Sequence, residues 1–245
     1  MKTQASIPVI AIDGPSASGK GTVSALVAQA LNWHLLDSGA LYRLVALAAL
    51  KRSVSMDDVE QLVLITRTLD VSFCVKSTCV ASDFNVDSAG SPAKLETRLL
   101  LEGEDATQEI RTEQCGDLAS QVAVIPDVRL ELLKRQQDFR TLPGLVADGR
   151  DMGTVVFPDA LLKVFLTASV EERAKRRHSQ LMGKGISVTL ADLFGEISNR
   201  DKRDSQRAVA PLKPAADAVE VNTTDMTIHQ VVERIISLYN ERCRG

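Results

Sequence analysis

Short apolar runs alternate with stretches of helical periodicity along the chain, which has 245 residues. The run Val9–Ile12 is wholly apolar and ends at the turn signal Asp13-Gly14-Pro15, so it predicts a buried strand. Apolar residues then recur at intervals of three and four between positions 23 and 31, which predicts a helix. The chain therefore opens as a strand, a glycine-rich loop and a helix.

The same alternation continues along most of the remaining sequence. Ser38 is a candidate N-cap, and Ser55 with Asp58 and Ser169 with Glu172 are candidate capping boxes. We expect further strands at 34–36, 145–147, 161–166 and 218–221, and helices from 38 onward and over 57–68, 111–124, 127–139, 170–182, 190–203 and 228–238. Strands that alternate with helices favour a parallel sheet covered on both faces.

The middle of the chain follows a different pattern. Val71–Val75 indicates a strand, and Leu99–Leu101 is a candidate return strand. Residues 76–92 between them are rich in Ser, Asp, Gly and Thr and have no clear period. We therefore expect a loop or small hairpin region here, peripheral to the main sheet.

Composition narrows the classes of function. Hydrophobic residues make up 44% of the chain and charged residues 25%, as in soluble globular proteins, and the formal net charge is -3. This balance argues against a general affinity for nucleic-acid polymers, which needs a basic surface. The N-terminal segment lacks the apolar stretch of a signal peptide, and no apolar run approaches the roughly 20 residues that span a bilayer. We therefore expect a cytoplasmic protein that does not enter a membrane.

Neither the cysteines nor the helices indicate a metal cluster or a partner chain. Cys74, Cys79, Cys115 and Cys243 have no histidine at zinc-ligand spacing, so we expect unpaired thiols. No exposed heptad or long apolar surface helix calls for a dimer, and we expect a monomer.

The strongest chemical signal follows the first strand. The segment matches Gly-x-x-x-x-Gly-Lys, the pattern of phosphate-binding loops (P-loops), with a threonine one place later than in the commonest form. Its candidate nucleotide-binding residues are Gly14, Pro15, Ser16, Ala17, Ser18, Gly19, Lys20, Gly21 and Thr22. The glycines let several N–H groups point at one anion, and the following helix adds its positive end. Lys20 is placed to reach the β- and γ-phosphates, and Thr22 to serve Mg²⁺. P-loops also occur in GTPases, but the guanine-reading sequence Asn-Lys-x-Asp is absent from this chain.

Arginines follow two of the predicted strands. Arg43 follows the strand that ends near Asp37, and Arg150 follows the one that ends at Asp148. In a parallel sheet these positions face the ligand crevice, where guanidinium groups can offset the repulsion between two anionic substrates. A solvated surface charge is the alternative for each arginine taken singly.

A third basic cluster lies at 199–207. Arg200, Arg203, Asp204 and Arg207 are spaced by three and four, which would place them on one side of a helix. A solvent-exposed helix with internal ion pairs is the alternative interpretation. The preceding helix adds Arg173, Arg176 and Arg177. Together the two helices resemble a mobile basic lid that would exclude water from the substrates.

These segments resemble the bacterial cytidylate kinase family. Residues 14–22, 35–43, 147–158 and 207–212 fit its motifs, and the resemblance runs from about residue 7 to 240. It implies an α/β P-loop NTPase three-layer fold with a central parallel sheet, a helical lid and a peripheral acceptor-binding lobe with small β elements. The expected core is 7–70, 112–172 and 208–245, the lobe 71–111 and the lid 173–207. Residues 76–98 look longer than the family's usual stretch.

The resemblance also implies an activity and a set of site residues. The activity is ATP-dependent phosphorylation of CMP and dCMP. The resemblance places Ser38, Tyr42 and Arg43 in the acceptor site. It implies that the acceptor phosphate is bound by Arg43, Arg150 and Arg207. It also implies that the cytosine is bound by Ser120, Arg129 and Asp151, and that Arg200 and Asp204 approach the sugar.

We expect in-line transfer to an acceptor oxygen that is already anionic, so that no strong general base is needed. Lys20, Mg²⁺ and three lid arginines would neutralise the developing charge; these arginines are Arg176, Arg177 and Arg203. Asp148 either orders a Mg²⁺-bound water or stabilises its turn. Two alternatives stay open: a P-loop kinase that acts on UMP, AMP or a non-nucleotide, and a nucleotide-gated switch or binding module.

Overall fold

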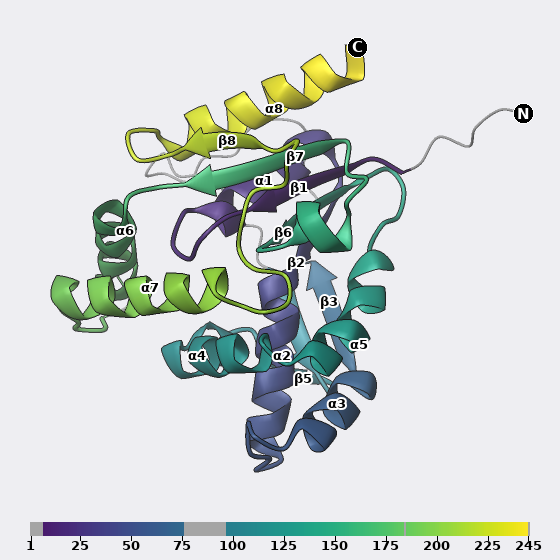
Figure 1. Cartoon of the computed structure of the whole chain (residues 1–245), viewed down its shortest axis with the longest axis vertical. Helices are drawn as coiled ribbons and strands as arrows, with labels where there is room; N and C mark the ends of the chain where they lie inside the picture. Colours follow the sequence, from purple (N-terminus) through teal and green to yellow (C-terminus); the bar gives the residue numbers. More distant parts are fainter. Residues whose placement is uncertain (1–6, 76–96, 184, 245) are drawn as a thin grey trace, which may run out of the picture. The chain divides into compact units, whose positions relative to one another are not determined.

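The computed structural model of the chain describes residues 7–75, 97–183 and 185–244. The chain divides into two compact units, residues 1–41 with 123–245 and residues 42–122. Figure 1 shows the helices and strands of both units along the sequence.

The first unit contains a five-stranded sheet in which every pair of neighbouring strands is parallel. Its strands are β1 (Val9–Asp13), β2 (His34–Asp37), β6 (Leu145–Gly149), β7 (Leu162–Thr167) and β8 (Val219–Asn222), in the order β2-β6-β1-β7-β8. The predicted parallel sheet is therefore confirmed. β1 lies in the middle of this order, so the loop after β1 opens at the centre of the sheet's carboxyl edge.

Helices α1 (Lys20–Leu31) and α8 (Ile228–Arg244) cover one face of this sheet (Figure 1). Alternate strand residues point toward them, as expected for strands whose side chains alternate between faces. The buried cluster comprises Ile10, Ile12, Val146, Leu162, Val164, Leu166 and Val221 from the sheet and Val23, Val27, Ala28, Val231, Ile235 and Leu238 from the helices. This packing fixes the start of α1 beside the end of β1.

The first unit also contains α5 (Pro126–Gln137), α6 (Val170–Met182), α7 (Leu190–Ser205) and a short π-helical turn, η2 (Met152–Val156). α6 and α7 form a helical hairpin with its own small apolar core (Figure 1). That core contains Ala174, Leu181, Leu193 and Ile197, and Ala17 of the P-loop packs against it. The hairpin is therefore attached to the loop after β1 by apolar contact.

The second unit has an antiparallel three-stranded sheet, in the order β3-β4-β5. It begins within α2 (Ser38–Lys51), at Tyr42. Its further elements are α3 (Val59–Arg67), β3 (Val71–Val75), β4 (Thr97–Leu101), β5 (Glu104–Asp105), the 3₁₀ turn η1 (Glu109–Arg111) and α4 (Glu113–Val122). The strand at 71–75, its return strand and their separation from the main sheet are confirmed, whereas β5 was not predicted. The expected loop over 76–92 lies outside the described residues, as does nearly all of the segment 76–98.

Three predicted details of the helix ends are wrong. Ser38 is the first helical residue rather than the cap, because Asp37 accepts the N–H of Ala40. Asp58 by itself caps α3 by accepting the N–H of Gln61, so Ser55 forms no capping box with it. α7 ends at Ser205, so Arg207 lies beyond the helix whose face it was expected to share. The cap at Ser169 is confirmed, since its hydroxyl accepts the N–H of Glu172.

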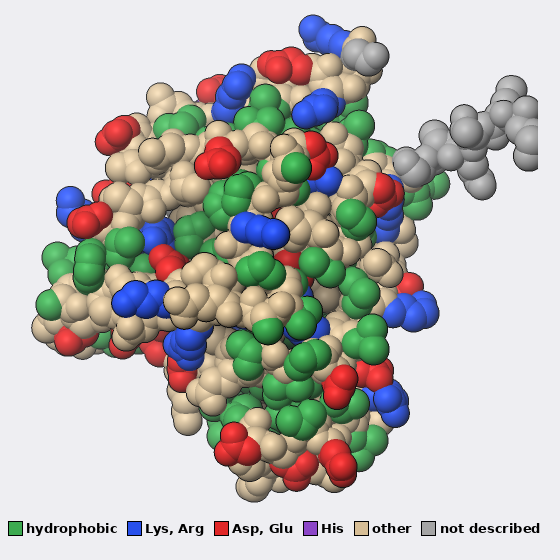
Figure 2. All heavy atoms as spheres, in the orientation of Figure 1, with side chains coloured by type: hydrophobic (Ala, Val, Ile, Leu, Met, Phe, Trp, Pro, Cys, Tyr) green, Lys and Arg blue, Asp and Glu red, His purple; other side chains and the backbone are tan. Residues whose placement is uncertain are grey.

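No helix in the described part of the chain is long and apolar enough to cross a membrane. On the face that Figure 2 shows, Lys and Arg side chains are interspersed with those of Asp and Glu. Charges of both signs on this face agree with a formal net charge of only -3.

Candidate active site

The loop between β1 and α1 is curled tightly around its lysine. Gly14 has a φ of 151°, and a Cβ there would collide with the carbonyl oxygen of Leu166. Gly19 has a φ of 89° just before α1 begins. The Lys20 ammonium donates to the carbonyl oxygen of Pro15 at 2.8 Å, across the loop. The curled loop that the sequence predicts is confirmed, with its backbone N–H groups at the start of a helix.

Lys20 is buried among other cations. Burial lowers the pKa of its ammonium, and the nearby Arg150 and Arg200 lower it further. Asp148 and Asp13 oppose this shift with their negative charge. A group of buried cations is stabilised by an anion that enters among them, so this part of the first unit is suited to phosphate.

Asp148 places a buried carboxyl next to the start of α1. It lies on β6 beside Asp37 of β2. Burial raises the pKa of its carboxyl, Lys20 opposes the rise and Asp37 adds to it. A Cβ added at Gly21 would lie 3.5 Å from Asp148 Oδ2, so the carboxylate faces the first turn of α1, where Thr22 is exposed. In the described residues no group of three or more His, Cys, Asp or Glu side chains could hold a metal by itself.

Asp204 joins two of the predicted acceptor arginines. Its carboxylate, 1% exposed, accepts from Arg150 Nε at 3.0 Å and also pairs with Arg207. Burial acts to raise the pKa of Asp204, but the two arginines outweigh it and the net pKa is lowered. Arg207 Nε is buried and has no hydrogen-bond partner within the described residues. The structure therefore brings Arg150, Asp204 and Arg207 together, with one donor still unused.

A second buried ion pair lies between α5 and the turn after β6. Arg129 of α5 pairs with Asp151, and both side chains are less than a tenth exposed. Arg129 also donates to the carbonyl oxygen of Ala123 at 3.3 Å. Nearby in the same unit, Ser38 Oγ donates to Gln136 Oε1 at 2.9 Å. The buried Arg129–Asp151 pair presents a donor group and an acceptor group side by side, a combination that can read the edge of a base.

Two arginines of α6 reach the P-loop backbone. Arg173 donates to the carbonyl oxygen of Ser16 at 3.2 Å and to Asp201 of α7 at 2.6 Å. Arg176 donates to Thr223 and, at 3.5 Å, to the carbonyl oxygen of Ser18. Arg176 therefore lies near the phosphate loop, and its role in neutralising charge on the transferred group stays a prediction.

Three further arginines, Arg177, Arg200 and Arg203, lie on α6 and α7. Arg177 donates to the side chain of Gln180 at 2.7 Å on α6 itself. Arg203 is exposed on α7, whereas Arg200 is half-buried and lies close enough to lower the pKa of Lys20. Arg200 and Arg176 thus lie near the loop, and the lid roles of Arg177 and Arg203 stay predictions.

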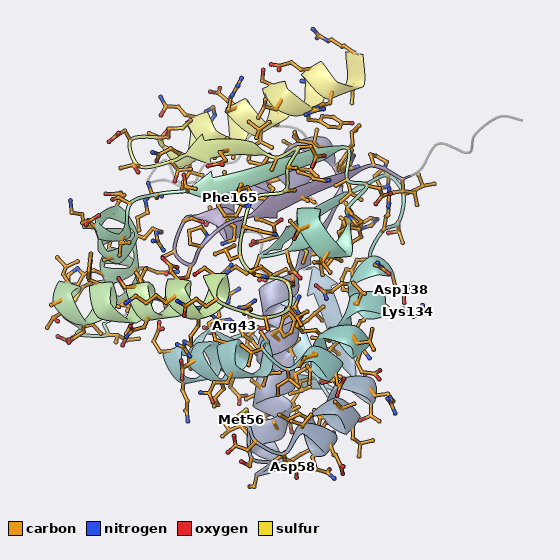
Figure 3. The ribbon with its side chains drawn as sticks, in the orientation of Figure 1. Arg43, Met56, Asp58, Lys134, Asp138 and Phe165 are labelled. Carbon is orange, nitrogen blue, oxygen red and sulfur yellow. The ribbon has the colours of Figure 1, made fainter. Side chains whose placement is uncertain are left out.

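Three predicted residues, Tyr42, Arg43 and Ser120, belong to the second unit. Arg43, labelled in Figure 3, belongs to α2. Its guanidinium donates to the carbonyl oxygen of Ile110 at 2.6 Å. Its guanidinium passes so close to Gly116 that a Cβ there would lie 3.0 Å away. Tyr42 is buried, and Ser120 Oγ is buried without a hydrogen-bond partner among the residues that are described. An unused buried hydroxyl is a feature of sites that receive a polar ligand.

Sequence reasoning missed two contributors to this geometry. Asp13 was treated as part of a turn signal, but its carboxylate accepts the N–H groups of Met152 and Gly153. Thr223, after β8, holds Arg176 through its hydroxyl and carbonyl oxygens. Both contacts join residues more than 40 positions apart, and no local pattern encodes them.

Comparison with known proteins identifies a family and several similar chains. The family model for cytidylate kinase matches residues 10–241. The cytidylate kinase of Pseudomonas paraeruginosa (strain PA7) is 58% identical over 232 residues, which cover 95% of each chain. That of Pseudomonas syringae pv. tomato is 57% identical over 230 residues and 94% of each chain. Among solved structures, a gluconokinase from Sinorhizobium meliloti has a TM-score of 0.44 at 14% identity, over 96% of this chain and 92% of that chain.

Proposed function

The chain belongs to the cytidylate kinase family, and from this premise we propose that it transfers the γ-phosphoryl group of ATP to the phosphate of CMP or dCMP. The observation that carries the proposal is the convergence of cations from two sources. Lys20 of the P-loop and Arg150 of the turn after β6 are close enough for Arg150 to lower the pKa of Lys20. Two anionic substrates repel one another, and cations from the P-loop and from the turn after β6 can offset this repulsion where they converge.

On the donor side, the P-loop backbone from Gly14 to Thr22 would hold the ATP phosphates. Lys20 would leave the Pro15 carbonyl oxygen, its present partner, and neutralise charge on the transferred group. Arg176 would add positive charge from α6, since its guanidinium already extends to the Ser18 carbonyl oxygen. Arg177 and Arg203 would join it when the α6–α7 hairpin, the proposed lid, closes over ATP.

Mg²⁺ is part of the same proposal. Thr22 and Asp148 would hold the ion, directly or through water, together with the ATP phosphates. When bound, it would supply positive charge to the β- and γ-phosphates. The buried carboxyl of Asp148 suits this role because a divalent cation would oppose the rise in its pKa that burial causes.

On the acceptor side, Arg150 and Arg207 would bind the CMP phosphate. The phosphate would compete with Asp204 for both guanidinium groups, and the unused Nε of Arg207 favours such an exchange. Arg43 would add a third guanidinium from the second unit, where Tyr42 is also assigned to the acceptor. The acceptor oxygen is anionic, so these residues have only to position it and stabilise charge.

Cytosine and its sugar would be read by polar groups that are already buried. The carboxylate of Asp151 can accept from the cytosine amino group, and the guanidinium of Arg129 can donate to a ring acceptor. Ser38 and Ser120 would contribute hydroxyls, while Arg200 and Asp204 would approach the sugar. A base that left the Arg129–Asp151 pair unmatched would be rejected strongly. Because one chain carries all of these residues, we propose that it acts as a monomer.

A panel of acceptors tests the proposed function. With Mg²⁺ and ATP, we expect kcat/KM for CMP and dCMP to exceed that for UMP and AMP by at least about a hundredfold, as a site built on buried hydrogen bonds discriminates strongly. ADP release is measured for each acceptor and without one. Faster turnover of UMP or AMP would favour another nucleotide kinase. ATP hydrolysis that no acceptor accelerates would favour a nucleotide-gated switch.

A further inference from the structure

Asp13 ends β1, the strand that leads into the P-loop, but its side chain hydrogen-bonds to the backbone of the turn η2. Its side chain is buried, with the residue 5% exposed, and its two carboxylate oxygens accept the N–H groups of Met152 and Gly153, each at 2.8 Å. These N–H groups open the turn η2, and an N-terminal N–H has no carbonyl partner within its own helix. Asp13 therefore caps the turn that follows β6, from the neighbouring strand β1.

The capped turn directly follows the residues assigned to the acceptor. Arg150 and Asp151 lie between the end of β6 and the first residue of η2. The backbone carbonyl of Asp151 accepts the N–H of Val155 at 2.9 Å, so Asp151 belongs to the hydrogen-bonded frame of the turn. A shift of η2 would therefore move the side chains of Arg150 and Asp151 with it.

We propose that Asp13 is a positioning residue for the acceptor nucleotide, although it adjoins the loop that binds the donor. It fixes the N-terminus of η2 against β1 and so sets where Arg150 and Asp151 present their side chains. The inference rests on the proposed function, in which those two residues bind the phosphate and the base of CMP.

The packing around the turn supports this role. A Cβ added at Gly153 would lie 3.2 Å from the side-chain carbons of Lys163 and 3.4 Å from Asp13 Oδ2. The turn is thus packed closely against side chains of β1 and β7. A change in its hydrogen bonds would therefore displace neighbouring atoms.

The electrostatic surroundings of Asp13 also support its role in holding the turn. Burial raises the pKa of Asp13 to about 6, the N–H groups of Gly153 and Met152 oppose the rise, Asp151 adds to it and Lys20 opposes it. The two backbone bonds are thus the largest influence that favours the ionised carboxylate. Asp148 of β6 is a further charge near Asp13.

The substitution Asp13→Asn tests the proposal, because the side chain keeps its size but one N–H acceptor becomes a donor. We expect KM for CMP to rise about tenfold or more. KM for ATP should change by a clearly smaller factor, because Asp148 supports the Lys20 ammonium more strongly than Asp13 does. Asp217→Asn is the matched control, since it removes an exposed carboxylate that pairs with Lys163 and should leave both constants unchanged. Thermal unfolding of each variant measures any loss of folding.

Gly153→Ala provides a second test from the other side of the same contact. It crowds Asp13 and Lys163 without altering a charge, so KM for CMP should rise while KM for ATP stays constant. It carries the test if Asp13→Asn does not fold.

Equal rises in the two KM values, or a lowered melting temperature with both KM values unchanged, would overturn the role of Asp13. The unaltered enzyme separates this failure from that of the function. If the unaltered enzyme phosphorylates CMP, the proposed function stands whatever the variants do. If it does not, the function fails and the acceptor role of Asp13 fails with it.

Discussion

Lys20 illustrates how single residues of this chain are prepared for an anion. The residue is 6% exposed, and its surroundings lower the pKa of its ammonium through burial and through Arg150. In the unliganded protein the charged form is therefore disfavoured relative to water. A phosphate that enters beside Lys20 would reverse this effect, because an adjacent negative charge raises the pKa of an ammonium.

This reversal predicts proton uptake when a nucleotide binds. Calorimetric titration with metal-free ADP at pH 8, in two buffers of different ionisation enthalpy, should give heats that differ in the direction of uptake. The sign follows because the pKa of Lys20 is low before binding and higher afterward, so the complex holds more protons.

Lys20→Met is the control for this measurement. It should lose the buffer dependence and lower turnover by more than about tenfold, roughly 1.4 kcal/mol of transition-state stabilisation. Buffer dependence that the variant retains would assign the proton to another group.

Among the elements, α6 links the P-loop to α7 by buried hydrogen bonds. Arg173, whose side chain is 4% exposed, spans the carbonyl oxygens of Ala168 and Ser16 and the carboxylate of Asp201. The apolar contact of Ala17 with the core of the hairpin reinforces this link. The position of α7 and the conformation of the loop are therefore coupled within the first unit.

Arg173→Ala should weaken both the fold and donor binding. Removal of one partner of a buried pair costs about 3 kcal/mol, which lowers Tm by on the order of 10 °C in a chain of this size. KM for ATP should rise severalfold, since the Ser16 carbonyl loses its donor. Differential scanning calorimetry and initial rates measure these effects. Arg177→Ala, on the same helix but paired with exposed Gln180, should change Tm by less than about 2 °C. Equal losses of Tm in the two variants would contradict the link.

Helices and strands with a strong hydrophobic period could be predicted from the sequence, whereas the contacts that join them could not. The strand at 9–12, the P-loop and the helices of the hairpin follow local patterns of apolar, glycine and capping residues. The turn η2 has no such pattern, since the N–H acceptors at its start come from Asp13 of another strand. Arg207 was assigned to the face of α7 by spacing, whereas Asp204 holds it from beyond the end of the helix. Contacts over such separations depend on tertiary packing.

For the whole molecule, the formal net charge of -3 conceals a local concentration of cations. The first unit buries Lys20, Arg129 and Arg173, and each has a carboxylate nearby or in direct contact. Buried charges without partners would be costly, so these carboxylates stabilise the cations until a substrate arrives. The fold of this one chain thus keeps buried cations in place for phosphate, and we propose that the Arg129–Asp151 pair determines which acceptor is selected.

That assignment is tested most directly by comparing CMP and ATP on the variant Asp151→Ala. We expect kcat/KM for CMP to fall by about a hundredfold or more, while the dissociation constant of an ATP analogue changes by less than about twofold. Asp159→Ala, which removes an exposed partner of Arg140, serves as the control for folding. Equal losses of CMP turnover and ATP affinity in Asp151→Ala would contradict the account.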